Sequence, residues 1–180
     1  MIIKIAELTN FNSNHGYDAE VAIQRSVSTL YGLSPGRVTK GYVSAFDFII
    51  NDKTFELKIS AKGTKNSVIE LARADGRKSG LSSTKARFHM FLNNAGNIGK
   101  IRIIKTSELK DYYSKERPGT FLTETIGDKI GSKLANLDFT LFNDLMIAEM
   151  NYNYKTKEFD TDTIRGNSYA TRFIHSYLNI

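Results

Sequence analysis

The first regular pattern of apolar positions lies between residues 17 and 31, where apolar side chains recur with the period of a helix. The apolar members are Val21, Ala22, Ile23, Val27 and Leu30. This spacing places them on one helix face, and glycine, here Gly32, commonly follows the end of a helix. We therefore predict an amphipathic helix over residues 17–31.

Two stretches with the character of β-strands follow. Residues 42–50 are rich in aromatic and β-branched side chains, and residues 54–59 alternate strictly between polar and apolar. The polar residues 51–53 between them have the composition of a tight turn. Together these segments predict a β-hairpin.

Further elements are predicted as far as residue 114. Residues 67–73 and 100–105 have strand patterns, and Ser82-Ser83-Thr84 can cap a helix between them that reaches Leu92 and stops at residues 93–96. Ser107 can cap a short helix over residues 108–114. The order helix, three strands, helix, strand predicts an α/β fold with a mixed central β-sheet flanked by helices.

The remainder of the chain has a less regular pattern. Pro35 and Pro118 each precede a glycine and predict turns. Residues 121–134 are compatible with a helix or with irregular structure, and residues 138–150 with a strand or a helix. Because 180 residues fit one compact domain, we interpret residues 118–180 as a C-terminal elaboration of a single domain.

The composition limits the classes of protein to which this chain can belong. Hydrophobic residues make up 41% of the chain, which is enough for a sizeable core, and cysteine is absent, which excludes disulfides and cysteine nucleophiles. The first residues lack a cleavable signal pattern, and no apolar run is long enough to span a membrane. These features predict a soluble, intracellular (cytoplasmic) protein without a membrane partner.

The charge favours a polyanionic partner. The formal net charge is +6, and basic residues outnumber acidic ones between Lys62 and Arg87. A glycine-punctuated basic loop over residues 73–80, leading to a predicted helix N-terminus, is a candidate phosphate-contact surface. The candidate nucleic-acid contacts are Lys62, Lys65, Arg73, Arg77, Lys78, Ser79, Thr84 and Lys85. The alternative is a solvated basic face.

Three residues of the predicted hairpin have the chemistry of a hydrolytic site. Asp47 is surrounded by apolar neighbours, and burying an unpaired carboxylate costs several kcal/mol, so its presence requires a partner. Glu56 and Lys58 share one face of the second strand because side chains alternate. Two carboxylates can bind Mg²⁺ together with a phosphate, and a lysine beside them can position the attacking water.

The pattern Asp47-x8-Glu56-Leu57-Lys58, within this order of elements, resembles the PD-(D/E)xK nuclease superfamily. The superfamily includes restriction and homing endonucleases, junction resolvases and phage exonucleases. The resemblance covers residues 17–105 and implies a restriction-endonuclease-like αβββαβ core. It departs from the family pattern at Phe46, where proline is frequent.

The resemblance implies a Mg²⁺-dependent DNA endonuclease of restriction, homing or resolvase type, from a bacterial or phage setting, in which Mn²⁺ can substitute. Asp47, Glu56 and the carbonyl of Leu57 would hold the metal, and Lys58 would serve the attacking water. Glu20, on the first helix, would reach the same site; the alternative is an exposed helix glutamate. Such enzymes often form homodimers, and residues 118–180 would then serve DNA recognition or dimerisation, with Arg165 and Arg172 as possible contacts.

Other classes of function remain open. The hairpin residues could form a surface salt bridge in a non-catalytic nucleic-acid-binding protein, or the fold could serve an exonuclease or an RNA-directed nuclease. The three histidines lack metal-ligand spacing, and His89 is expected to be a packed residue. The glycine-rich residues 127–131 lack a P-loop lysine, so no nucleotide cofactor is expected.

Overall fold

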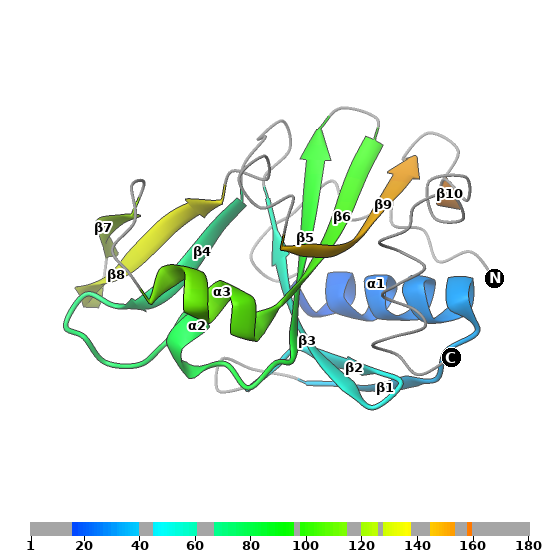
Figure 1. Cartoon of the computed structure of the whole chain (residues 1–180), viewed down its shortest axis with the longest axis horizontal. Helices are drawn as coiled ribbons and strands as arrows, with labels where there is room; N and C mark the ends of the chain where they lie inside the picture. Colours follow the sequence, from blue (N-terminus) through cyan, green and yellow to red (C-terminus); the bar gives the residue numbers. More distant parts are fainter. Residues whose placement is uncertain are drawn as a thin grey trace.

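The computed structural model describes residues 16–39, 45–60, 67–95, 98–114, 120–125, 128–137, 145–153 and 158–159. These residues form an α/β fold with a seven-stranded mixed sheet, a three-stranded antiparallel sheet and three helices (Figure 1). In chain order the elements are α1 (Gly16–Tyr31), β1 (Pro35–Val38), β2 (Phe48–Ile50), β3 (Lys53–Ile59), β4 (Ser67–Arg73), α2 (Gly80–Ser83), β5 (Phe88–Ala95), β6 (Ile98–Lys105), α3 (Thr106–Tyr113), β7 (Thr120–Thr125), β8 (Asp128–Leu137), β9 (Met146–Asn153) and β10 (Glu158–Phe159).

The predicted amphipathic helix is confirmed as α1. Ile23 and Val27 of its apolar face are buried, and Gly32 follows the helix with a φ of 65°, which a glycine adopts without strain. The buried amide of Gln24 donates two hydrogen bonds of 2.7 Å, to the carbonyl oxygens of Gly36 and Ile49. Gln24 therefore fastens α1 to β1 and β2, the two strands nearest to it in sequence.

The predicted hairpin is formed by β2 and β3, which pair antiparallel. Asn51 and Asp52 both have positive φ, 45° and 62°. A two-residue hairpin turn needs positive φ at both positions if its twist is to match that of the strands. The rings of Phe48 and Phe55 stack across the hairpin with centroids 5.5 Å apart. Strand β2 begins only at Phe48, and residues 42–44 of the predicted strand lie outside the described residues.

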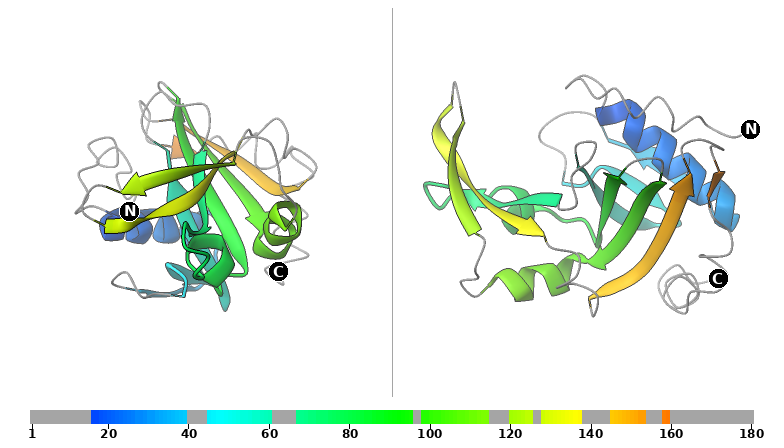
Figure 2. Two further views of the ribbon diagram at one scale, coloured as in Figure 1. Left: turned by 90° about the vertical axis from the view of Figure 1, so that its left-hand side faces the viewer. Right: turned by 90° about the horizontal axis from the view of Figure 1, so that it is seen from above.

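The main sheet has the strand order β1-β2-β3-β5-β6-β9-β10, with β3 and β5 parallel and the other neighbours antiparallel. The turn predicted at Pro35 is instead the start of the edge strand β1. α1 lies on one side of this sheet and α3 on the other, as the first two figures show (Figure 2).

The helix predicted from Ser82 to Leu92 is wrong. Only Gly80–Ser83 is helical, and Phe88–Ala95 is strand β5. All six residues from Phe88 to Asn93 are buried, because both faces of β5 are covered. A strand buried on both faces has a continuous apolar run, which periodicity alone does not distinguish from a helix.

The strand predicted over residues 67–73 is confirmed as β4, but it does not join the main sheet. It pairs with β8, which pairs with β7, so it lies at one edge of the three-stranded sheet. Residues 121–134, expected to be helical or irregular, lie largely in β7 and β8, and the ambiguous residues 138–150 end in strand β9. The C-terminal third therefore supplies strands to both sheets.

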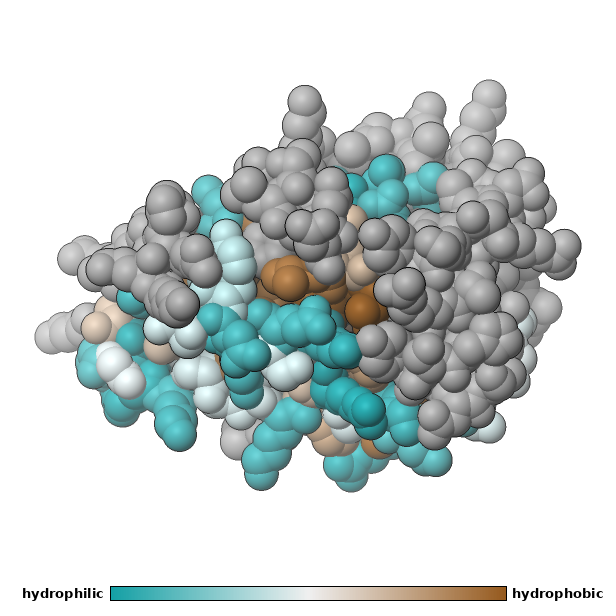
Figure 3. Space-filling view, in the orientation of Figure 1, coloured by the Kyte–Doolittle hydropathy of each residue, from teal (hydrophilic) through white to brown (hydrophobic). Residues whose placement is uncertain are grey.

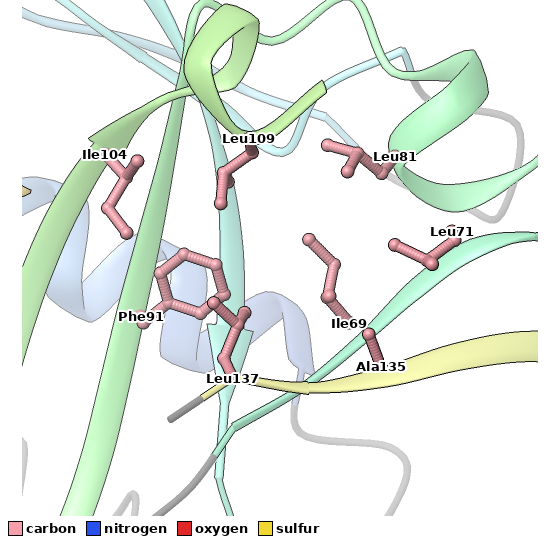
Figure 4. Close-up of a cluster of buried hydrophobic side chains, with 8 residues drawn as sticks. All are labelled: Ile69, Leu71, Leu81, Phe91, Ile104, Leu109, Ala135 and Leu137. Atoms are coloured by element: carbon pink, nitrogen blue, oxygen red, sulfur yellow. The ribbon is translucent and has the colours of Figure 1, made fainter. Parts of the chain in front are cut away.

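A cluster of buried apolar side chains connects the two sheets. Its buried members come from β4, α2, β5, β6, α3 and β8 (Figure 4). They are Ile69, Leu71, Leu81, Phe91, Ile104, Leu109, Ala135 and Leu137. Because Ala135 and Leu137 come from β8, the C-terminal third contributes side chains to this core. The predicted short helix is confirmed as α3, which begins two positions earlier than expected.

The surface of the described residues is predominantly polar in the view of Figure 3, with a small apolar area near its centre. Among the described residues, Val68 is a large apolar side chain that is exposed. No helix within those ranges combines the length and apolar character needed to cross a membrane.

Candidate active site

The hairpin places the predicted acidic residues at the start of β2 and in the middle of β3. Asp47 immediately precedes β2, and its N–H donates to the carbonyl oxygen of Phe55 at 2.8 Å. Phe55 and Leu57 are buried, whereas Glu56 and Lys58 are partly exposed on the opposite side of β3. The predicted alternation of β3 is thus observed.

A backbone hydrogen bond orients the Asp47 carboxylate toward β3. Its Oδ2 accepts a hydrogen bond from the N–H of Leu57 at 2.6 Å. Leu57 lies in the part of β3 that extends past the start of β2. The Thr39 hydroxyl donates to the backbone carbonyl of Asp47 at 2.8 Å and fixes the other side of this residue. Because the N–H and C=O of one strand residue point to the same side, the carbonyl of Leu57 also faces Asp47.

The Glu56 carboxylate is held through both of its oxygens. Lys58 Nζ donates to Oε1 at 2.5 Å, and Thr84 Oγ1 lies 3.3 Å from Oε2. The Glu56 side chain is 14% exposed and that of Lys58 is 30% exposed. The pair is therefore accessible at the surface but less hydrated than an ordinary exposed ion pair.

The electrostatics bring Glu20 into the same group. Burial and the charges of Asp47 and Glu56 together raise the pKa of Glu20 from 4.5 to about 7, against the opposing charge of Lys58. Burial, reinforced by Glu56, likewise raises the pKa of Asp47 from 3.8 to about 6, against the Leu57 N–H and Lys58. Three carboxyl groups thus share one ammonium, an arrangement that favours an added cation.

The donor set fits Mg²⁺ as a partly hydrated ion. Within the described residues, no group of three His, Cys, Asp or Glu side chains is arranged to hold a metal ion. Mg²⁺ is commonly bound through one or two carboxylates, with waters and substrate phosphate completing its shell. Asp47, Glu56 and the carbonyl of Leu57 supply hard oxygen donors of this kind, and Glu20 adds a further carboxyl nearby.

Sequence reasoning missed two residues beside this group. Lys110 on α3 donates from Nζ to the carbonyl of Thr84 at 2.9 Å, a contact that joins segments far apart in sequence. His89 pairs in register with Glu56 across β3 and β5 and therefore lies on the same side of the sheet. The sequence near each residue does not indicate that it lies beside this site, because helix packing places Lys110 there and strand pairing places His89 there.

His89 is a packed residue, as expected, although it lies on a strand rather than on a helix. It is 1% exposed, and its Nδ1 lies 2.9 Å from Thr106 Oγ1. Burial, together with the charges of the Lys58 and Lys110 ammonium groups, lowers its pKa from 6.5 to about 3. His89 is therefore neutral at physiological pH.

Several of the predicted nucleic-acid contacts have partners within the protein. Arg77 binds Asp75 at 2.6 Å and Arg73 approaches it at 4.0 Å, which lowers the pKa of Asp75. Ser79 donates to Glu70, and Thr84 lies beside Glu56. Lys78 and Lys85 are exposed, while Lys62 and Lys65, like Arg165 and Arg172, lie outside the described residues.

Comparison with protein-family models, with curated proteins and with solved structures found no match to this chain. Function therefore has to be inferred from the chemistry of the site, because a fold alone does not determine it. The feature with the clearest chemical content is the group formed by Glu20, Asp47, Glu56 and Lys58.

Proposed function

We propose that the protein is a Mg²⁺-dependent deoxyribonuclease, an endonuclease acting on duplex or junction DNA. The observation that carries this proposal is the crowding of three carboxyl groups around one lysine at the edge of a hairpin. Burial and mutual repulsion raise the pKa values of Glu20 and Asp47. Perturbed carboxyl groups of this kind are concentrated at functional sites.

In this proposal each side chain has a separate task. Asp47 and Glu56 hold the metal, with the Leu57 carbonyl as a further oxygen donor. Bound there, Mg²⁺ would supply an acidified water and a counter-charge for the phosphate. Lys58, 2.5 Å from Glu56, positions the attacking water and offsets charge that develops on the phosphate. Glu20, with a pKa of about 7, is suited to accept a proton near neutral pH.

The arrangement of elements supports membership in the PD-(D/E)xK superfamily. Helix α1 precedes the hairpin, the hairpin carries the acidic residues, and β3 runs parallel to β5 in a mixed sheet. The separate sheet of β4 departs from a single αβββαβ layer. A net charge of +6, with Lys78 and Lys85 exposed, suits contacts with DNA phosphates. A homodimer that cuts both strands is part of the proposal.

The test is cleavage of supercoiled plasmid, linear duplex and a four-way junction, each with Mg²⁺, with Mn²⁺ and with EDTA. Glu56→Gln and Lys58→Met should abolish metal-dependent cutting. Lys100→Met is the matched control, because Lys100 pairs with Glu149 at 2.9 Å in the same sheet. Binding of all three substrates without cutting would instead favour a non-catalytic nucleic-acid-binding protein.

A further inference from the structure

The side chain of Thr84 links β3, the strand that carries Glu56 and Lys58, to two other parts of the fold. It lies after α2 and before β5, outside both elements, and is 8% exposed. Its Oγ1 lies 3.1 Å from the carbonyl oxygen of Ala45, 3.3 Å from Glu56 Oε2 and 3.1 Å from the N–H of Ala86. One hydroxyl therefore contacts both the strand that carries Glu56 and the segment that leads to Asp47.

The hydrogen-bonding capacity of this hydroxyl decides where its proton goes. A threonine hydroxyl donates one hydrogen bond, and here it accepts from the N–H of Ala86. The carbonyl of Ala45 already accepts from the N–H of Lys85 at 2.9 Å. The Thr84 proton can therefore go to Glu56 Oε2 without leaving the Ala45 carbonyl unsatisfied, and a charge-assisted bond to a carboxylate is the stronger choice.

The backbone around Thr84 is held at several points. Lys110 donates to its carbonyl oxygen at 2.9 Å from α3. The N–H of Arg87 donates to the carbonyl and to the hydroxyl of Thr54, each at 3.0 Å, at the start of β3. Residues 84–87 therefore run beside β3 in a defined position, and the Thr84 hydroxyl is directed rather than mobile.

We propose that Thr84 is a positioning residue for Glu56, and that Lys110 fixes Thr84. The inference rests on the proposed function, because it concerns the orientation of a metal-binding carboxylate. Lys58 holds Oε1 and Thr84 holds Oε2, so the carboxylate plane of Glu56 is set before metal or substrate arrives. Thr84 thus acts within the protein rather than as the DNA contact expected from the sequence.

The first experiment needs no metal. Thr84→Val removes the hydroxyl, Thr84→Ser retains it, and each is combined with Glu56→Ala, which removes the carboxylate, in a double-mutant cycle of urea unfolding in EDTA. We expect the effect of Thr84→Val to depend on Glu56, and that of Thr84→Ser to depend on it far less. A purely structural role, through Ala45 and Ala86 alone, would make the effects of Thr84→Val and Glu56→Ala additive, which would overturn the proposal.

The second experiment measures Mg²⁺ binding by calorimetry and DNA cleavage for the same single variants. Loss of a residue that orients a metal ligand typically weakens metal affinity or activity by about tenfold to a hundredfold, which we expect for Thr84→Val. Thr84→Ser should recover most of this loss, and Lys110→Met should cause a smaller one. Ser83→Ala is the neighbouring control, since the Ser83 hydroxyl bonds to the Gly80 carbonyl at 3.2 Å.

The two experiments separate the inference from the proposed function. If the wild type binds Mg²⁺ and cuts DNA while Thr84→Val does both equally well, the role of Thr84 is refuted and the nuclease stands. If the wild type neither binds Mg²⁺ nor cuts DNA but the cycle shows coupling, the nuclease is refuted and the link from Thr84 to Glu56 stands.

Discussion

Replacing Glu20 by glutamine should stabilise the metal-free protein at about pH 8. Burial and the charges of Asp47 and Glu56 raise the pKa of Glu20 from 4.5 to about 7. The folded state therefore binds this proton more tightly than the unfolded chain does. The stability that Glu20 contributes is present below pH 4.5 and is lost as the pH rises toward about 7. Glutamine keeps the shape and removes the charge.

The size of the effect follows from the same pKa. At about 1.4 kcal/mol for each pH unit, the interval from 4.5 to about 7 corresponds to roughly 3 kcal/mol for a fully buried group. Glu20 is only partly buried, so solvent screening reduces the expected gain to about 1–2 kcal/mol. At about pH 4 the carboxyl is largely protonated, and the variant and the wild type should differ little.

Urea unfolding in EDTA at about pH 8 and about pH 4 measures this difference. Glu149→Gln is the control, because hydrogen bonds and charge from Lys100 and Arg102 lower the pKa of Glu149. That variant should be destabilised near pH 8, the opposite sign. If Glu20→Gln is no more stable than the wild type at about pH 8 while Glu149→Gln behaves as expected, Glu20 does not belong to the carboxylate group.

Two further predictions concern metal binding and the packing of α2. Mg²⁺ should raise the unfolding temperature more at about pH 8 than at about pH 5, because Asp47, with a pKa of about 6, must lose its proton to bind the metal. Glu20, with a pKa of about 7, adds negative charge beside the site once it ionises. Scanning fluorimetry measures this difference, and an equal rise at both pH values would contradict it. Gly80→Ala should cost roughly 2–4 kcal/mol in urea unfolding, because Gly80 has a φ of 48° and a Cβ there would lie 2.3 Å from the Glu70 carbonyl oxygen. Gly76→Ala, with a φ of 83° and nothing within 4 Å, should cost less, and equal losses would refute the steric explanation.

The hairpin and its polar face could be predicted because they depend on local sequence. Strict alternation from Thr54 to Ile59 determines which residues share a face, and the turn chemistry of Asn51 and Asp52 determines the register. Grouping Glu56 and Lys58 on one face required no long-range information. Their catalytic roles stay a prediction.

The missed features depend on contacts between distant segments. Strand β5 was predicted as a helix because its burial on both faces comes from α3, β8 and other elements that the local pattern does not reveal. The choice of β8 as the partner of β4 depends on residues more than fifty positions later in the chain. Thr84 reaches Glu56 across 28 positions and Ala45 across 39, so its place in the site could be seen only in the folded structure.

The most direct test of the central claim is DNA cleavage by Asp47→Asn as a function of Mg²⁺ concentration. Asparagine can still accept the hydrogen bond from the Leu57 N–H, so the hairpin should fold as in the wild type, which circular dichroism checks. We predict that the wild type cuts DNA only with Mg²⁺ or Mn²⁺ and that folded Asp47→Asn has lost at least about a hundredfold in rate. Cleavage by folded Asp47→Asn at the wild-type rate, with the same Mg²⁺ dependence, would contradict the proposed active site.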